Sequence, residues 1–268
     1  MRYDQLFTGV LLISLSSCTK ELPPTEPPPG NTVIYYDKNS SAQVVSQIFN
    51  YNGQSEVNLT NDLMHNYWWI KVSGDKAKFL CYRSPKVNNN YLDNKSNDYA
   101  NADLMVFNID GTNPRVIIQK GKYGWSEQGV AKFSPDGTKI LMAALCVDPA
   151  SGNNDLHWRL IVTDVNGNNP KIISTRNSLF ADPAWSPDGK KIVYVTLPPG
   201  LLFGVQDQFE LYAADYNAVT NKIENETRLT TDDKDCFDPC WSPDGKYIAF
   251  SRSKFLELIP LPGNADII

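Results

Sequence analysis

The chain has 268 residues, with 25 basic and 30 acidic side chains, a formal net charge of −5 and 41% hydrophobic residues. This acidic balance, with no basic patch in the sequence, argues against a nucleic-acid-binding protein. The apolar and aromatic content suits a globular β protein, and no apolar run beyond the N-terminus is long enough to span a bilayer.

The first segment predicts export from the cytoplasm. Arg2 precedes an apolar run over residues 6–15, as in secretory signal peptides. The next residues, Leu-Ser-Ser-Cys at 15–18, resemble the cleavage box of bacterial lipoproteins. That resemblance implies a signal peptide over 1–17 and a lipid on Cys18, which would hold the protein to a membrane. An ordinary signal peptide with a chance cysteine, or a buried strand, are the alternatives.

Residues 18–30 predict a lipidated tether. Five of them are prolines, which favour the extended polyproline conformation. Thr19 follows the cysteine, where an aspartate would favour retention in the inner membrane under the lipoprotein sorting rules. We therefore expect an outer-membrane-anchored lipoprotein of the bacterial envelope, facing the periplasm or the cell surface. One folded domain is expected over 31–268.

Pairs of short apolar-polar runs follow, and most are joined by Asn-Gly or Asp-Gly. Such pairs predict β-hairpins, because these dipeptides accept the positive φ of tight turns. The hairpins are expected at 47–60, 104–118, 160–174 and 210–230.

Three further stretches share the core Phe/Trp-Ser-Pro-Asp-Gly, followed by a basic residue and an apolar run. Proline presets φ, aspartate bonds its own backbone and glycine takes positive φ, so each core predicts a tight turn between two strands. A fourth copy at 72–80 keeps the frame without the proline and the glycine. We expect a structural rather than a catalytic role for the turn residues, which are Pro135, Asp136, Gly137, Pro187, Asp188, Gly189, Pro243, Asp244 and Gly245.

Each core and the hairpin after it form a unit of four antiparallel strands, A to D, and tandem units of this kind are propeller blades. The core, a strand, an Asp/Asn-Gly turn and an Arg-Leu-Thr ending together resemble the WD40-like repeat of TolB-type β-propellers. The resemblance covers roughly 43–250. It implies an all-β fold and a scaffold role, and it carries no specific partner, because propellers host many functions.

The count of units is about five. Complete units begin near Trp68, Val130 and Asp182. A fourth begins at Asp238, with its last strands expected over 254–268, and strands at 32–36 and 43–59 supply a partial fifth. We therefore predict a propeller of about five recognisable units that is incomplete or truncated, where TolB-type propellers usually have six.

Two segments come close to catalytic or metal-binding motifs. Residues 124–129 approach the nucleophile elbow of hydrolases, but Gln128 stands where a glycine is required. Residues 164–168 offer alternating oxygen donors, but Asn169 and Thr175 replace the glycine and glutamate of a calcium loop. We interpret the first as a connection between blades and the second as a hairpin turn.

Histidines and cysteines do not favour a metal site either. Sugar-acid lyases with related propellers use clustered histidines, which His65 and His157 alone cannot supply. Cys236 and Cys240 lie in an apparently extended segment, about 13 Å apart, too far for a disulfide unless the chain turns. Together with Cys81 and Cys146 they are expected to be buried or free thiols, with a disulfide or a metal site as the alternative. We expect no cofactor.

Three long insertions, at 84–102, 145–156 and 197–208, fall between strands B and C. The B–C and D–A loops share one end of a meander blade, and insertions that gather on one face mark a binding surface. Aromatic and apolar loop tips suit a protein or a glycan. The candidate partner-binding residues are Tyr91, Tyr99, Trp125, Asp182, Leu202, Phe203 and Asp238. Alternatively, the aromatic residues pack on neighbouring loops and the two aspartates cap the D–A loops.

The sequence therefore favours a non-enzymatic envelope lipoprotein whose propeller is a scaffold for a protein or cell-wall-associated partner, with membrane contact through the lipid on Cys18. A carbohydrate-binding accessory lipoprotein is the alternative, and a propeller hydrolase or lyase is a further one.

Overall fold

The computed structural model describes ten segments of the chain, which are residues 33–38, 46–51, 55–62, 64–85, 99–152, 154–176, 183–199, 209–231, 235–252 and 255–260. The predicted signal peptide, the proline-rich tether and Cys18 lie outside these residues. Within them, no helix has the length and apolar character needed to cross a membrane.

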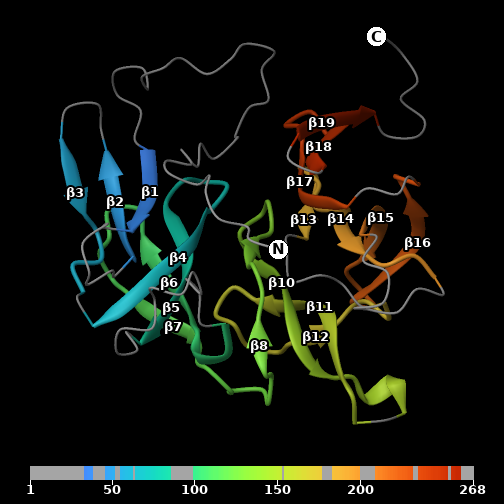
Figure 1. The fold of residues 1–268 in the computed structure, drawn as a ribbon, viewed down its shortest axis with the longest axis horizontal. Coiled ribbons are helices and arrows are strands. Elements are labelled where there is room, and N and C mark those ends of the chain that lie inside the picture. Colours follow the sequence, from blue (N-terminus) through green and yellow to red (C-terminus); the bar gives the residue numbers. More distant parts are fainter. Residues whose placement is uncertain are drawn as a thin grey trace, which may run out of the picture.

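The described chain is built from antiparallel strands in five sheets, which follow one another around a common centre (Figure 1). The first sheet contains β1 (Val33–Lys38), β2 (Ser46–Tyr51) and β3 (Glu56–Asn58). The second contains β4 (His65–Val72), β5 (Lys78–Pro85), β6 (Asp103–Asn108) and β7 (Arg115–Ile118). The third contains β8 (Glu127–Gln128), β9 (Lys132–Phe133), β10 (Lys139–Val147), β11 (Leu156–Asp164) and β12 (Lys171–Ile172).

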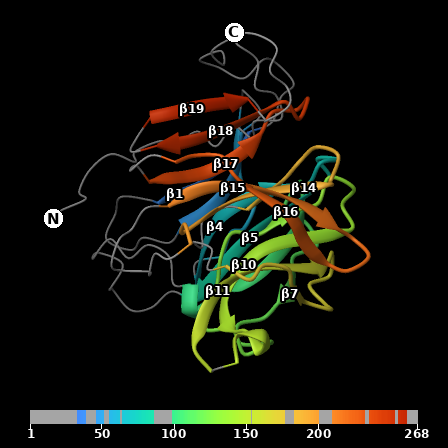
Figure 2. The same cartoon turned by 90° about the vertical axis from the view of Figure 1, so that its right-hand side faces the viewer.

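The last two sheets complete the arc. The fourth contains β13 (Ala184–Trp185), β14 (Lys191–Thr196), β15 (Glu210–Asn217) and β16 (Lys222–Arg228), and the fifth contains β17 (Cys236–Trp241), β18 (Tyr247–Arg252) and β19 (Phe255–Pro260). Figure 2 shows β17, β18 and β19 running side by side beyond the fourth sheet. Two short 3-10 helices, η2 (Tyr99–Asn101) and η3 (Pro149–Ser151), lie in B–C connections. The all-β propeller predicted from the repeats is confirmed.

The first sheet corresponds to strands B, C and D. The Leu59 N–H donates to the Ile48 carbonyl at 2.7 Å, and the Ile48 N–H donates to Thr60 Oγ1 at 3.2 Å. The same two bonds join strand C to the end of strand D in later sheets, through the sets Leu160, Ile173, Ser174 and Leu211, Leu229, Thr230. This equivalence makes β2 strand C and β3 strand D, so β1 is strand B.

The A–B turns have the same hydrogen bonds in four sheets. In the fourth sheet, Ser186 Oγ donates to Asp188 Oδ1 at 2.6 Å and accepts from the Lys191 N–H at 2.8 Å, while Asp188 Oδ1 accepts from the Lys190 N–H at 3.0 Å. The equivalent serine–aspartate pairs are Ser73 and Asp75, Ser134 and Asp136, and Ser242 and Asp244. This network replaces ladder bonds that a tight turn lacks. It agrees with the structural role expected for these aspartates, which stays a prediction.

Turns of neighbouring sheets also lie against one another. A β-carbon on Gly189 would lie 3.8 Å from Pro135 Cδ, and one on Gly245 would lie 3.7 Å from Pro187 Cδ. Between the sheets, the Trp241 indole N–H donates to the Ala184 carbonyl at 3.2 Å, and the Tyr82 hydroxyl donates to the Gly129 carbonyl. Buried side chains from adjacent sheets fill the space between them, as in the cluster of Leu141, Leu160, Trp185, Ile192 and Tyr194.

Two boundaries differ from the predicted ones. The second insertion was expected at 145–156, but β10 and β11 stay paired out to Val147 and Leu156, because the ladder continues past the buried residues. The insertion therefore spans only 148–155. Asp238 was expected ahead of strand A, but it lies inside β17 at a β-bulge with φ 51°, because Pro239 cannot donate to a regular ladder.

Candidate functional site

The end of the propeller that carries the B–C and D–A connections is the candidate site. Gln128, which follows a D–A connection, donates from Nε2 to the carbonyl of Ala102 at the close of the first long insertion, at 2.9 Å. The Ser126 N–H of the same connection donates to the Leu145 carbonyl at 2.8 Å. The first bond places a D–A connection beside a B–C connection, and the second joins the D–A connection to β10 two residues before this strand ends at Val147. The two kinds of loop therefore share one end.

Three consecutive blades each place an arginine–carboxylate pair at this end. Arg83 and Asp103 lie 2.7 Å apart, Arg159 and Asp148 2.8 Å, and Arg228 and Glu210 3.0 Å. Asp103 and Glu210 each begin a strand that follows an insertion, and Asp148 is the first residue of the insertion after β10. The pairs therefore fix the bases of the loops. Sequence reasoning missed them, although charged residues at strand ends beside insertions were a readable signal.

The Arg159–Asp148 pair is the most deeply buried, with side chains 5% and 7% exposed. Asp148 also accepts a bond from the Ala150 N–H at 2.9 Å, at the start of η3. Burial alone would raise the pKa of Asp148, but the bonds from Arg159 and Ala150 lower it below its ordinary value. The carboxylate is therefore held ionised, as a fixed anchor for the loop.

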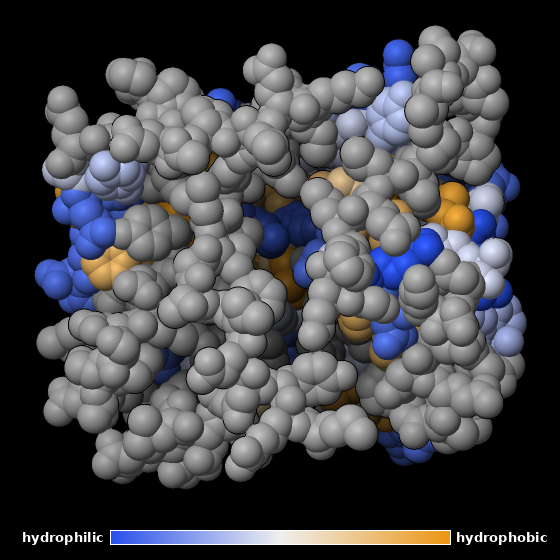
Figure 3. All heavy atoms as spheres, turned by 45° about the horizontal axis from the view of Figure 1, so that its top comes forward, coloured by the Kyte–Doolittle hydropathy of each residue, from blue (hydrophilic) through white to orange (hydrophobic). Residues whose placement is uncertain are grey.

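A small apolar patch, named the apolar tip here, lies at the last pair of the β10–β11 ladder, next to the start of the 148–155 insertion. Val147 and Leu156 are register partners at the end of β10 and β11, and they are 40% and 48% exposed. Directly opposite residues on two strands interact, so the two side chains form one small apolar surface. In Figure 3, hydrophilic and hydrophobic residues lie side by side near the centre of the view.

The structure describes the side chains of two of the seven candidate residues. Trp125 is half-buried against the core, with its ring 4.9 Å from that of Tyr123, whose hydroxyl donates to the Gly167 carbonyl at 2.7 Å. Asp238 is exposed in the bulge of β17. The side chain of Tyr99 lies outside the described residues although its backbone begins η2, and Tyr91, Asp182, Leu202 and Phe203 are outside them altogether.

A second polar cluster lies where the first sheet connects to the second. Asp62 accepts bonds from the Met64 N–H at 2.8 Å and the Tyr67 hydroxyl at 2.8 Å, and it contacts His65 Nδ1 at 2.7 Å. Burial opposes ionisation of Asp62, but these bonds together lower its pKa. The cluster orders the D–A connection before β4.

The chemistry of metal and thiol groups is limited in the part of the chain that the structure describes. No group of three or more His, Cys, Asp and Glu side chains is arranged there to hold a metal ion. No disulfide joins the described cysteines. Burial raises the pKa of Cys146 to about 11, which keeps its thiol protonated at neutral pH.

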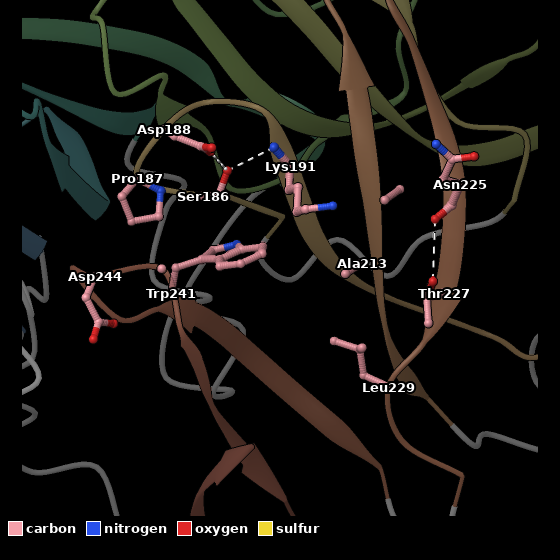
Figure 4. Close-up of a pocket in the computed structure, with 12 residues that line it drawn as sticks. Ser186, Pro187, Asp188, Lys191, Ala213, Asn225, Thr227, Leu229, Trp241 and Asp244 are labelled. Atoms are coloured by element: carbon pink, nitrogen blue, oxygen red, sulfur yellow. Dashed lines mark hydrogen bonds between the residues drawn. The ribbon is translucent and has the colours of Figure 1, made fainter. Parts of the chain in front are cut away.

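A cavity of about 370 Å³ lies between the fourth and fifth sheets (Figure 4). Pro187 and Trp241 line one side, and Leu229 and Thr227 line the other. Its charged groups are already engaged, since Asp188 accepts from Ser186 and Lys191 pairs with Asp215. The cavity is therefore a packing groove between sheets, without a convergent catalytic pair among its lining residues.

Comparison with known proteins gives partial matches in sequence and broad matches in fold. No family model matches the chain. Over 48 residues it is 46% identical to the Tol-Pal system protein TolB of Wigglesworthia glossinidia brevipalpis, which covers 18% of this chain and 11% of that relative.

Solved structures share the fold over most of the chain. TolB from Acinetobacter baumannii superposes with a TM-score of 0.58 at 15% identity, covering 88% of this chain and 54% of that protein. An oligogalacturonate lyase in complex with manganese superposes with a TM-score of 0.55 at 17% identity, covering 80% of this chain and 56% of the lyase. The chain thus spans about half of each of these proteins. It has the β-propeller fold that TolB shares with an enzyme.

Proposed function

We propose that this protein is a non-enzymatic binding module of the bacterial cell envelope, which takes a protein partner at the B–C end of its propeller. The single observation that carries the proposal is the apolar tip of Val147 and Leu156, held by the buried Arg159–Asp148 pair. An exposed apolar tip on a rigid base suits a protein partner, because little conformational entropy is lost on binding.

The envelope setting is supported by two observations. The N-terminal residues 1–18 resemble a lipoprotein leader, and a 48-residue stretch is similar to a Tol-Pal system protein. We propose that Cys18 carries a lipid and that residues 19–30 hold the propeller away from the membrane. A Cys18→Ser variant should move from the membrane fraction to the soluble fraction; equal membrane recovery of both proteins would contradict the lipid anchor.

Site-specific photo-crosslinking tests the binding surface. A photoreactive phenylalanine analogue at Val147 or at Leu156, in living cells, should capture the same protein partner. Val219 provides a matched control, because it is 92% exposed and apolar but lies in the β15–β16 turn at the opposite end of a blade. Capture of the same partner at equal yield from Val219 would contradict the proposed surface, and capture of glycan alone would replace the protein partner by a carbohydrate.

The proposed binding residues in the loops can be tested in the same way. We propose that Tyr91, Tyr99, Trp125, Asp182, Leu202, Phe203 and Asp238 belong to the same surface. The photoreactive analogue at Tyr91 and at Leu202 should capture the partner caught from Val147. Capture of different proteins from these positions would separate the loops from the apolar tip.

A further inference from the structure

Among the residues that the structure describes, the first sheet has no counterpart of the innermost strand that the other four sheets share. The second to fifth sheets each begin with a strand A, in β4, β8–β9, β13 and β17. The first sheet contains strands B, C and D in the order β1-β2-β3. Among the described residues, β1 pairs with β2 alone, so its other edge has hydrogen-bonding groups but no described strand beside it.

The register of the repeats shows where a strand would add. Val33 of strand B pairs with Tyr51, which is the third residue after Ile48 in strand C. In the complete sheets, the equivalent strand B residue likewise pairs with the third residue after the strand C leucine. The residues at the position of Val33 are Phe79, Ile140, Ile192 and Ile248, and the strand A residues opposite them are Val72, Phe133, Trp185 and Trp241. An aromatic residue is therefore the usual neighbour of this position.

The residues just before β1 are poorly suited to fill the strand A position themselves. Counting back from Val33, Gly30 stands at the place of Gly189, while Pro27 and Pro29 stand at the places of Ser186 and Asp188. In the other turns that serine donates its N–H and the aspartate accepts two bonds, as in Ser186 and Asp188. Proline has neither an N–H nor a carboxylate, so this segment cannot make the network that closes the turn.

A second copy is no better as a donor. Every strand that the structure describes already belongs to one of the five sheets, and 265–268 are the run expected for strand D of the fifth. A copy could supply a strand only by giving up one of its own. A chain of different sequence meets no such cost.

We propose that the open edge of β1 accepts an extended segment of a partner protein, which adds antiparallel to β1 and places an aromatic residue opposite Val33. Backbone hydrogen bonds give such strand addition its affinity, and alternate side chains give it specificity. An apolar cluster already supports β1, because Ile34 and Ile48 are buried together with Tyr67 and Phe79. The inference rests on the proposed function, since it names how part of the partner would be held.

A register-specific disulfide tests strand addition directly. The probe is a synthetic peptide that copies residues 182–191 with cysteine in place of Trp185, added to the full chain carrying Val33→Cys. Oxidation should give a mixed disulfide at least tenfold faster than with a control peptide that carries its cysteine one residue earlier, because a shift of one residue turns the side chain to the other face. Equal rates for the two peptides would overturn the proposal. Dimers linked through the introduced cysteine would also overturn it, because they would identify a second copy as the occupant.

A completed blade provides a test on a protein without the new cysteine. The combined variant Thr25→Ala, Glu26→Trp, Pro27→Ser and Pro29→Asp gives the chain its own copy of the strand and turn of the fourth sheet. It should raise Tm by several degrees and abolish the rise in Tm that the unmodified 182–191 peptide gives with the wild-type protein. A wild-type Tm that does not respond to the peptide would sink the idea, whether or not the variant folds.

The two proposals fail differently. If β1 takes no strand, capture of a partner from Val147 and Leu156 should persist, and only the present inference is lost. If the peptide adds to β1 but the crosslinkers at Val147 and Leu156 capture no protein, the proposed binding surface is lost instead.

Discussion

Lys76 adopts, at φ 58°, the left-handed backbone conformation that Gly137 adopts at φ 69° in the equivalent place of the next A–B turn. The turns are otherwise alike, because Ser73 bonds Asp75 as Ser134 bonds Asp136. A β-branched or long side chain is strained in this region, whereas glycine is not. The second sheet therefore keeps its turn through the serine–aspartate network despite an unfavourable residue.

Substituting Lys76→Gly should stabilise the protein by about 0.5–1 kcal/mol, because relief of left-handed strain exceeds the entropy that glycine adds to the unfolded chain. Urea unfolding followed by fluorescence measures the change. The matched variant is Gly137→Lys, at a position where a β-carbon meets nothing within 4 Å, so only the backbone term changes. It should be destabilising by a similar amount; a stabilising Gly137→Lys would contradict the argument.

Gly167→Ala should cost clearly more stability than Gly121→Ala. Both glycines have positive φ, at 73° and 70°, so both substitutions carry the backbone strain of about 1 kcal/mol. A β-carbon on Gly167 would also lie 2.5 Å from Ile118 Cγ1 and 2.6 Å from the Ile117 carbonyl of the neighbouring sheet, whereas one on Gly121 meets nothing. Thermal unfolding of the pair measures the difference, and equal Tm values would show that the two sheets can separate without cost.

Removing one charge of the Arg159–Asp148 pair should destabilise the protein strongly, whereas removing both charges should destabilise it only mildly. Arg159→Met leaves a buried carboxylate without its partner and should cost about 3–5 kcal/mol. The double variant Arg159→Met/Asp148→Leu removes both charges and should recover most of that loss. A double-mutant cycle in denaturant measures the coupling. Additive losses would mean that the two charges act independently, in conflict with the 2.8 Å contact.

Acid should weaken the A–B turns. The serine hydroxyl bond is the largest cause that lowers the pKa of Asp136 and of Asp188, followed by a backbone N–H bond. A lowered folded pKa contributes stability above the unfolded value of about 3.9, and this contribution is lost as pH falls through the folded value. Stability should therefore decline below about pH 4. The double variant Asp136→Asn/Asp188→Asn keeps an acceptor oxygen without the charge, so its decline should be shallower; an identical slope would exclude these two groups as its source.

The fold could be predicted from the sequence because one turn recurs in it, and the residues of that turn have known conformational preferences. Ser186, Pro187, Asp188 and Gly189 specify one turn, and the same residues recur where the other turns form. The near-motif at 124–129 was interpreted as a connection, but its residues Glu127–Gln128 form β8 and pair with β10, so part of the segment belongs to the inner strand.

The candidate site was harder to predict because its residues are brought together across strands. Asp148 and Arg159 are separated by an insertion, and they meet only because β10 and β11 stay in register to Val147 and Leu156. The bulge at Asp238 was equally hidden, since a proline in a strand can mark either an edge or a bulge. The partner-binding role of the seven candidate residues stays a prediction.

The contacts between neighbouring A–B turns, with Pro135 beside Gly189 and Pro187 beside Gly245, have a consequence for how the molecule loses structure. Each sheet is supported by the sheets beside it, so the middle of the array is held from two sides, whereas β1–β3 and β17–β19 stand at the two extremities of the described array. Amide protons should therefore exchange with solvent soonest in those outer strands and latest in β10, β11 and β14. Unfolding would therefore proceed from the outer sheets toward the middle ones. A ligand bound to either outer sheet would slow it.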